Sequence, residues 1–505
     1  MKQLNIYFTS DIHGYFFPTT YEDDKISQMG LFSCMNQCSK DENTLILDGG
    51  DILQGSAFAS YCHEKEKSPR IIADILNSCG YDFVTIGNHD FNYGTDYLRS
   101  FYQQLNAVCV CQNVLDANGN VLFPYQIITM KNGLRVGIMG IVTDFVNVWE
   151  TKENIADMQI TSPLEAAKKN FLELKEQSDV TICIYHGGFE RNLESEELLS
   201  ENSENIACKI CETLDFDVLL TGHQHMHVAG RYYHGTYILQ PRENGSECYK
   251  IKIEVEKNIE KETYQISSIL SEEIKAYAKK DTLQQTKFLS VQSKVQSWLD
   301  IEIGVLKENL FPKEKLEMAL NGSALADFLN EVQVFYSGAQ ISAVSLANEV
   351  AGIPKQVTRR NVLTSYPYPN TLLVLEITGE SLKAAIERSC EYFSLDIAGK
   401  PAISEKFLNP KIEHYNYDYF LGVTFERDLK NEPGNRVKNL CYKGKDVRPE
   451  DTFTICVNNY RASGAGGYPM YPKCRIVKEL HAEMSKLIID YIKTHSTKDE
   501  TEIKT

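Results

Sequence analysis

The feature that most constrains this chain is a series of short apolar segments, each ending in or followed by residues that can bind metal ions. Five segments read as buried strands because they are short, apolar and bounded by glycine or polar residues: LNIYF, TLILD, FVTIG, VTICIY and VLLTG. The residues that follow or end them are Asp11, His13, Asp51, Asn88, His89, His186, His223 and His225. Strand ends place reactive groups on a rigid support beside an open loop, so the pattern predicts one shared site.

No single motif in this series is decisive. An isolated aspartate or asparagine after a strand is usually a turn former or a helix cap. The ordered succession SDIHG, LDGGD, TIGNHDFNYG, YHGG and LLTGHQHMH is far more specific than any of its members. His227 continues the alternation after His225, and the pattern leaves its role open between ligand and ordinary histidine.

These residue types fit a pair of divalent cations that hydrolyse a phosphate ester. The reaction needs an activated water, neutralised phosphoryl oxygens and a stabilised leaving oxygen, and two ions ~3.5 to 4 Å apart supply all three. Mixed nitrogen and oxygen ligands favour manganese, iron or zinc, and Asp51 is the natural bridging carboxylate. Residues two apart in an extended segment point the same way, so Asp11 and His13 are expected to meet one ion, and His223 and His225 likewise.

Residues 1 to about 250 resemble the metallophosphoesterase domain of the bacterial 5'-nucleotidase family. Within that family, GNHDFNYG resembles the 2',3'-cyclic-nucleotide phosphodiesterase/3'-nucleotidase branch. The resemblance implies two ligand sets that share Asp51: Asp11, His13, Asp51 and His225 for one ion, and Asp51, Asn88, His186 and His223 for the other. It also implies that His89 lies beside the scissile phosphate and stabilises the developing charge or the departing oxygen.

The chain departs from the family pattern near this histidine. Many 5'-nucleotidases have an aspartate three residues after it, where this chain has Asn92. With that partner missing, Asp90 or a backbone carbonyl is expected to orient the His89 ring. His89 and Asp90 are therefore the predicted catalytic residues.

The second half of the chain resembles the C-terminal nucleotidase domain of the same family, most specifically in NNYRASGAGGY. The resemblance implies that two aromatic rings grip the nucleobase, and the matching positions are Tyr417 in YNYD and Tyr460 in NNYR. Stacking on a base is worth ~1 to 3 kcal/mol and tolerates any base. The alternative is that either tyrosine is a core residue with a satisfied hydroxyl group.

A second departure concerns the phosphate. Family members that bind 5'-phosphates have arginines in the stretch matching SLANEVAGIPKQVTRRN. Arg359 and Arg360 are present there, but the earlier arginine of the family pattern is not recognisable. This difference weakens the case for a 5'-nucleotidase.

The length of 505 residues exceeds what one core usually supports, so two domains are expected. The predicted division is a catalytic domain over 1–270, a linker helix over 271–300, a substrate-binding domain over 301–490 and a disordered tail over 491–505. Alternating strands and helices alone would suggest a doubly wound parallel sheet. The resemblance instead implies an α/β protein with a four-layer αββα sandwich followed by an α/β C-terminal domain, and this is the expectation adopted.

Composition limits the partners. A formal charge of 17 negative argues against binding polymeric nucleic acid, and no stretch is long and apolar enough to cross a membrane. The first strand begins almost at the first residue, so a cytoplasmic location is expected, and an extracellular one only if a leader has been removed. The 14 cysteines lack zinc-site or redox-motif spacing and are expected to be reduced and mostly buried. No protein partner is implied.

The sequence thus predicts a hydrolase with two divalent metal ions that opens 2',3'-cyclic nucleotides and removes 3'-phosphates. The C-terminal domain would hold the base and select the phosphate that is presented. A 5'-nucleotidase or nucleotide-sugar hydrolase with the same metal centre is the first alternative. A nucleotide-binding sensor without catalytic activity is the alternative from another class.

Overall fold

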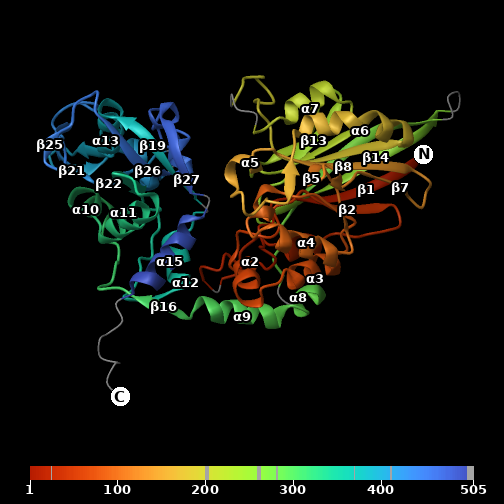
Figure 1. The fold of residues 1–505 in the computed structure, drawn as a ribbon, viewed down its shortest axis with the longest axis horizontal. Coiled ribbons are helices and arrows are strands. Elements are labelled where there is room, and N and C mark those ends of the chain that lie inside the picture. Colours follow the sequence, from red (N-terminus) through yellow and green to blue (C-terminus); the bar gives the residue numbers. More distant parts are fainter. Residues whose placement is uncertain are drawn as a thin grey trace, which may run out of the picture. The chain divides into compact units, whose positions relative to one another are not determined.

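The chain forms two compact units, Met1–Gln296 (unit 1) and Ser297–Thr505 (unit 2) (Figure 1). This computed structural model describes residues 1–23, 25–199, 204–258, 263–279, 282–368, 370–409, 412–480 and 482–496. The division falls within helix α9 (Leu289–Leu299). A chain of this length therefore splits into two cores, as predicted.

Unit 1 is built on two mixed sheets. The strand order of the first sheet is β15 (Thr263–Lys275), β14 (Glu247–Asn258), β1 (Lys2–Thr9), β2 (Thr44–Asp48), β3 (Phe83–Val84) and β4 (Val108–Cys109). The order of the second is β12 (Val228–Tyr233), β13 (Thr236–Gln240), β11 (Val218–Thr221), β10 (Val180–His186), β8 (Arg135–Val142) and β7 (Gln126–Thr129). A smaller sheet joins β6 (Val121–Phe123), β5 (Cys111–Asp116) and β9 (Met158–Ile160).

The strands that precede the predicted ligands run parallel. Strand β1 pairs in parallel with β2, and β2 with β3. In the second sheet, β10 pairs in parallel with β8 and β11. Antiparallel strands are confined to the outer positions, including β14 beside β1 and β12 beside β13. The carboxyl ends of the central strands therefore lie at one edge of each sheet.

The main core of unit 1 lies between the two sheets. It joins Ile6, Phe8 and Leu47 of the first sheet to Ile138 and Ile182 of the second, all buried. These strands read as continuous apolar runs because both of their faces are covered. The inter-sheet core fixes the two sets of strand ends relative to each other.

Helices cover the outer faces of the sandwich. A second apolar cluster packs α6 (Pro163–Gln177) and α7 (Ala207–Thr213) against the far face of the second sheet. Figure 1 shows α3 (Arg70–Cys79) and α4 (Thr95–Gln104) on the opposite side of the layered sheets. The predicted four-layer αββα sandwich is confirmed. The remaining short helices of unit 1 are α1 (Leu31–Met35), α2 (Ala57–Tyr61), η1 (Cys62–Glu66), η2 (Asn88–Phe91), α5 (Val146–Trp149) and α8 (Leu283–Thr286).

The segment predicted as one linker helix over 271–300 has a different structure. Strand β15 continues to Lys275 and pairs with β14 over nearly its whole length, so the sheet extends beyond residue 270. Two separate helices, α8 and α9, follow it. Charged residues at 271–275 lie on a strand because cross-strand pairing decides the conformation of an edge strand more strongly than local composition.

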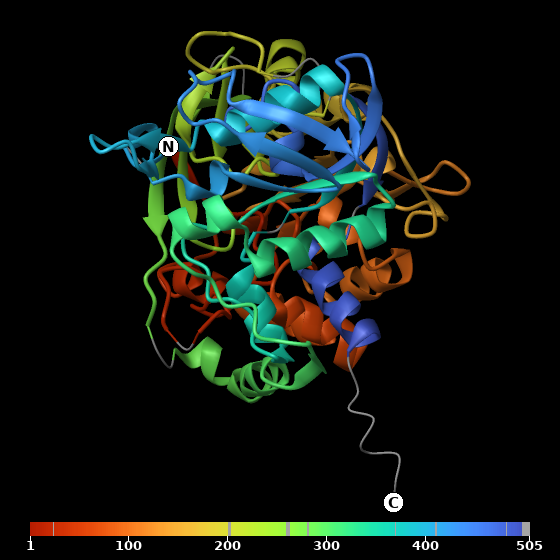
Figure 2. The same cartoon turned by 90° about the vertical axis from the view of Figure 1, so that its left-hand side faces the viewer.

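Unit 2 has a central mixed sheet with strand order β22 (Asp418–Leu421), β17 (Ile341–Ser345), β26 (Thr452–Asn458), β19 (Leu372–Thr378) and β27 (Arg475–Leu480). Apolar clusters pack α11 (Ala324–Ser337) and α15 (Met484–His495) on one face and α13 (Gly379–Cys390) on the other. Figure 2 shows the strands between α13, in cyan, and α11, in green. Unit 2 is therefore the α/β domain that was predicted.

Smaller elements of unit 2 surround this sheet. They are β16 (Glu302–Val305), β18 (Gln356–Thr358), β20 (Phe393–Leu395), β21 (Pro401–Ile403), β23 (Val423–Arg427), β24 (Val437–Tyr442), β25 (Lys445–Asp446), α10 (Lys315–Asn321), α12 (Arg359–Ser365), α14 (Asn459–Ala462), η3 (Glu405–Phe407), η4 (His414–Asn416) and η5 (Tyr471–Lys473). Helix α15 extends through residues 491–495, so the predicted disordered tail begins too early. The rest of that tail, 497–505, lies outside the described residues.

Two further expectations concern the whole chain. Every one of the 14 cysteines is a free thiol, and most of them are buried. In the part of the chain that the structure describes, helices are all too short or too polar to cross a membrane.

The inter-sheet core allows a direct test. Replacing Ile182, which is fully buried between the sheets, with alanine should lower the free energy of unfolding by about 2 to 5 kcal/mol, because the substitution leaves a cavity. Leu172→Ala is the matched control, since Leu172 on α6 is 71% exposed and its truncation should cost less than about 0.5 kcal/mol. Denaturant unfolding measures both, and equal losses would contradict a core at this position.

Candidate dinuclear metal centre

The predicted ligands converge where the central strands of the two sheets end. Asp11 and His13 follow β1, Asp51 follows β2, and Asn88 opens η2 after β3. From the second sheet, His186 is the last residue of β10, and His223 and His225 follow β11. Ligands as far apart in the sequence as Asp11 and His225 thus meet at one place, as expected from the parallel pairing of these strands.

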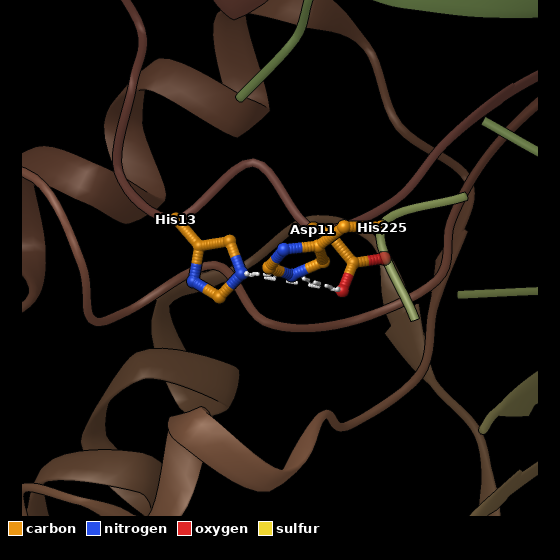
Figure 3. A group of neighbouring side chains, drawn as sticks. All are labelled: Asp11, His13 and His225. Carbon is orange, nitrogen blue, oxygen red and sulfur yellow. Dashed lines mark hydrogen bonds and ion pairs between the residues drawn. The ribbon is translucent and has the colours of Figure 1, made fainter. Parts of the chain in front are cut away.

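One half of this cluster contains Asp11, His13 and His225 (Figure 3). The two Nε2 atoms of His13 and His225 are 3.0 Å apart, and His225 Nε2 is 3.4 Å from Asp11 Oδ1. Asp11 is fully buried and His13 nearly so. Three potential ligand atoms therefore face one another around a common point.

The other half gathers Asp51, Asn88, His186 and His223. His186 Nε2 is 3.2 Å from Asp51 Oδ2 and 3.1 Å from Asn88 Oδ1. His223 Nδ1 is 2.8 Å from the same asparagine oxygen. Asp51 Oδ2 is also 3.8 Å from His13 Nε2, so this carboxylate lies between the two halves, as a bridging ligand must.

The outward nitrogens of the histidines are held by acceptors. His13 Nδ1 donates to the Gln54 carbonyl at 3.0 Å, and His186 Nδ1 donates to the Gly49 carbonyl at 2.7 Å. His223 Nε2 donates to the Glu204 carboxylate at 2.8 Å. Each acceptor fixes a proton on the outward nitrogen, so the other ring nitrogen faces the centre and is the one that a metal ion would bind.

The electrostatics of the cluster call for a cation. Burial works to lower the pKa of His186, but the Asp51 and Asp11 carboxylates outweigh it and raise that pKa to about 10. Burial lowers the pKa of His13 to about 4, against the opposing effect of Asp51. Asp51 Oδ2 is buried without a hydrogen-bond partner among the described residues. A buried carboxylate oxygen that lacks a donor and is surrounded by imidazoles is suited to bind divalent ions. The residues present therefore fit a pair of such ions.

Most ligands lie on strained backbone. The φ angles are 55° at Asp11, 50° at His13, 58° at Asp51, 74° at His223 and 55° at His225. The left-handed region is uncommon for residues other than glycine and costs ~1 to 3 kcal/mol at such sites. These pairs lie in tight turns after the strands, so the expected alternation along an extended strand is wrong. His223 and His225 face different halves of the cluster, as the family resemblance implied.

Two glycines let the loops approach one another. A Cβ atom at Gly87 would collide with the Asp51 backbone and carboxylate, and one at Gly222 would collide with Ser10 and Asp11. Both glycines come directly before predicted ligands, in GNHD and GHQH. The spacing of these motifs therefore reflects close packing as well as ligation.

His89 lies at the edge of the cluster, with its ring centroid 5.4 Å from that of His13. Its Nδ1 atom is 2.9 Å from Asn92 Oδ1, so Asn92 is its partner. The spacing of three residues between His89 and Asn92 could have indicated this contact, because residues three apart lie on one face of a 3-10 helix such as η2.

Asp90 has a different role from the predicted one. It is fully buried and accepts hydrogen bonds from the backbone N–H groups of Asp51, Ile52, Leu53 and Gly87. Burial and the charge of Asp51 raise the pKa of Asp90 to about 6, against these donors. Asp90 therefore holds the loop that carries Asp51 and does not orient the His89 ring.

The ambiguous His227 lies outside the cluster of predicted ligands. Its Nδ1 atom is 2.8 Å from Glu247 Oε1, and the other oxygen of this carboxylate accepts from Arg242 at 2.8 Å. His227 is thus a hydrogen-bonded histidine in a separate ionic network.

The structure does not support the predicted base contact at Tyr417. Tyr417 is 7% exposed, and its hydroxyl group donates to the Ala319 carbonyl at 2.9 Å. Its ring packs among Tyr392, Phe393 and Tyr419. It is therefore a core residue with a satisfied hydroxyl group, which is the alternative that the sequence left open.

Other tyrosines lie near Tyr460, whose side chain is exposed. Burial raises the pKa of Tyr368, and the neighbouring Tyr415 and Tyr460 hydroxyl groups raise it further, so the three phenols form one group. Tyr415 belongs to η4 and is only partly buried. Tyr415, two residues before Tyr417, is therefore the tyrosine of the YNYD segment that lies with Tyr460 near Tyr368.

Arg461 ties the two segments of this group together. It is buried and paired with Asp418 at 2.8 Å, and it also donates to the carbonyls of Tyr415 and Ala465, both at 2.9 Å. The arginine of the motif NNYRASGAGGY therefore holds the YNYD segment in place.

Comparison with known proteins assigns both units. Residues 4–227 match the model of the calcineurin-like phosphoesterases, and residues 302–473 match that of the 5'-nucleotidase C-terminal domain. A Staphylococcus aureus protein provisionally named a 5'-nucleotidase, solved with alpha-ketoglutarate, is 31% identical with a TM-score of 0.74, over 97% of this chain and 96% of that one.

Curated relatives carry two descriptions. The Haemophilus influenzae 2',3'-cyclic-nucleotide 2'-phosphodiesterase/3'-nucleotidase is 26% identical over 98% of this chain and 85% of its own length. The trifunctional nucleotide phosphoesterase protein YfkN of Bacillus subtilis is also 26% identical, but this chain spans only 38% of its length. The chain belongs to the 5'-nucleotidase family, with a calcineurin-like metallophosphoesterase domain and a 5'-nucleotidase C-terminal domain.

The acceptor of His223 gives a test of the metal centre. Glu204→Ala should weaken the binding of a divalent ion by about 10- to 100-fold, because the ligand imidazole loses the group that orients it. Manganese titration by calorimetry measures the affinity. Glu197→Ala, an exposed position in the same loop, should bind as the unaltered chain does, and equal affinities for all three proteins would exclude the proposed role of Glu204.

Proposed function

We propose that this protein hydrolyses nucleotide phosphoesters, opening 2',3'-cyclic nucleotides and removing 3'-phosphates. The observation that carries the proposal is the convergence of seven potential ligands from separate loops around a buried carboxylate oxygen of Asp51 that lacks a hydrogen-bond donor among the described residues. The seven are Asp11, His13, Asp51, Asn88, His186, His223 and His225. The intact set favours an enzyme over a nucleotide-binding sensor, which would not need every ligand.

The chemistry follows from this arrangement. Two divalent ions bound there would acidify a water and neutralise the phosphoryl oxygens. Asp51 would hold the ions at a fixed separation, and its Oδ1 atom accepts from the His89 backbone N–H at 2.7 Å. This bond fixes the backbone of His89 beside the centre, so its ring can exchange a proton with the substrate.

Two arginines bear on the choice between 3'- and 5'-phosphates. The Arg359 guanidinium stacks on Trp298 with its Cζ atom 4.2 Å from the ring centroid, and Arg359 is 7% exposed. Arg360 donates to Asp300 through Nε at 2.6 Å and through Nη2 at 3.0 Å. Both cations are engaged in contacts within unit 2, which supports a substrate other than a 5'-phosphate.

The 5'-nucleotidase alternative has its own support. The Staphylococcus aureus protein of 31% identity is provisionally named a 5'-nucleotidase. The same metal centre would serve a nucleotide sugar equally well, because ligation does not depend on the leaving alcohol. Substrate choice is therefore the property to measure first.

The test compares 2',3'-cyclic AMP, 3'-AMP and 5'-AMP with pure protein and manganese. We expect kcat/KM for the first two to exceed that for 5'-AMP by at least about 10-fold, a difference of ~1.4 kcal/mol in transition-state binding. Product analysis by phosphorus NMR identifies the bond that is cleaved. Asn88→Ala, which removes a ligand, is the inactive control.

The possible results separate the candidates. Preference for 5'-AMP would replace the proposal with the 5'-nucleotidase alternative. A protein that binds manganese and nucleotide but turns over none of the three would favour the sensor.

The role of unit 2 gives a further prediction. Tyr415→Ala and Tyr460→Ala should each raise KM for a nucleotide by about 5- to 150-fold, which corresponds to ~1 to 3 kcal/mol for a lost base stack. Steady-state kinetics measure this, and KM for bis(4-nitrophenyl) phosphate, which has no base, should not change. Tyr417→Phe, at the buried neighbour, is the control, and an effect there equal to that at Tyr415 would contradict the assignment.

A further inference from the structure

A chain of hydrogen bonds leads away from His89. His89 Nδ1 is 2.9 Å from Asn92 Oδ1, and Asn92 Nδ2 donates to Glu150 Oε2 at 2.7 Å. Glu150 directly follows α5, far from His89 in the sequence, and is 8% exposed. The acid that the family pattern places three residues after the histidine is absent here, and a carboxylate lies one hydrogen bond further out.

Glu150 is surrounded by donors. Its Oε1 atom accepts from the Thr151 backbone N–H at 2.7 Å and from Asn154 Nδ2 at 3.0 Å. Asn154 Nδ2 also donates to the Asn92 carbonyl at 3.0 Å, which ties the backbone of Asn92 to the same segment. Both oxygens of the carboxylate are therefore held as acceptors.

The direction of each bond follows from this. An ionised carboxylate only accepts, so the side-chain amide of Asn92 must turn its NH2 group toward Glu150. Its carbonyl oxygen then faces His89 and also only accepts, so His89 Nδ1 must carry the proton. The Nε2 atom of His89 is left with its lone pair for the substrate.

We propose that Glu150 is a positioning residue that sets the tautomer of His89 through Asn92. The inference rests on the proposed function, since it assigns His89 the proton transfer of that reaction. Asn92 conveys the polarity of Glu150 and carries no charge, so the pair Asn92–Glu150 replaces the aspartate of related enzymes. Nε2 of His89 accepts the proton that the attacking water loses and passes a proton to the leaving ribose oxygen, so the ring ends the cycle unchanged.

The same segment also contacts the metal ligands. Trp149, next to Glu150, stacks on His223 with ring centroids 5.3 Å apart and planes inclined by 26°. Trp149 therefore contacts a predicted metal ligand, while Glu150 reaches His89 only through Asn92. Substitutions at Glu150 must be checked for effects on metal binding before they are read as effects on His89.

The proposal predicts the results of exchanging the two groups. In Glu150→Gln the new amide can donate to Asn92, which permits the Asn92 amide to turn over and donate to His89 Nδ1, so the proton moves to Nε2. In Asn92→Asp two carboxylates face each other across the bond. In the double variant Asn92→Asp with Glu150→Gln, the introduced carboxylate accepts from His89 and the introduced amide donates to that carboxylate, so the original polarity returns.

The direct readout is the tautomer. Full-length protein loaded with zinc, a diamagnetic ion, and labelled with nitrogen-15 in histidine is measured by long-range proton–nitrogen NMR, and the His89→Gln variant assigns the signal. We expect the Nδ1–H form in the unaltered chain, a shift toward the Nε2–H form in Glu150→Gln, and its reversal in the double variant. This readout requires no substrate.

Kinetics provide the second readout. Glu150→Gln should lower kcat by about 10- to 100-fold with KM little changed, and the double variant should return kcat to within about 10-fold of the unaltered chain. Glu153→Gln, at a glutamate of the same segment that is exposed, should match the unaltered chain. Zinc content and melting temperature are measured for every variant. If Glu150→Gln does not fold, the tautomer and kcat of the double variant test the proposal.

The outcomes are distinct. An unchanged His89 tautomer in Glu150→Gln, or a double variant that recovers neither tautomer nor kcat, overturns the proposal and leaves Glu150 with a structural role only. An unaltered chain that does not hydrolyse cyclic or 3'-nucleotides overturns the proposed function, while the NMR result still decides the inference.

Discussion

The rest of the structure depends on the burial of two carboxylates, Asp11 and Asp51, at the meeting point of two sheets. A buried ion costs several kcal/mol unless opposite charge and hydrogen bonds compensate it. Here the compensation comes from histidines that lie at the ends of separate strands. One oxygen of Asp51 has no hydrogen-bond donor among the described residues. The inter-sheet core, the close approach at Gly87 and Gly222, and the outward acceptors of the histidines all serve to hold these charges together. The need for a cation follows from the fold itself.

Much of this was predictable because the ligands are local to the strands. Each predicted ligand ends or closely follows an apolar run, and parallel pairing brings those ends to one edge, so convergence followed from the order of motifs. The finer geometry did not follow. Left-handed turns, rather than strand alternation, aim Asp11 and His13 at a common point. Asn92 was within reach of prediction, since a spacing of three residues in a 3-10 turn places it beside His89.

The residues that could not be predicted come from loops with no fixed spacing to the motifs. Glu150 and Glu204 reach the histidines from segments 58 and 19 residues away from their hydrogen-bond partners Asn92 and His223. No periodicity marks such contacts, because they depend on how loops pack in three dimensions. The predicted base contact at Tyr417 was wrong for a related reason. The motif located the right segment, but only the 3-10 turn η4 decides that Tyr415 is partly exposed and Tyr417 is buried.

The left-handed backbone at the ligands has a consequence for engineering and for evolution. An L-residue in this conformation costs about 1 to 2 kcal/mol more than glycine would, and this applies at Asp11, His13, Asp51, His223 and His225. A library screened for heat resistance alone, without metal, would therefore enrich glycine at these positions. The selected variants would be more stable to heat but would lack the metal ligands. A screen for thermal stability of this fold therefore also needs a selection for catalytic turnover.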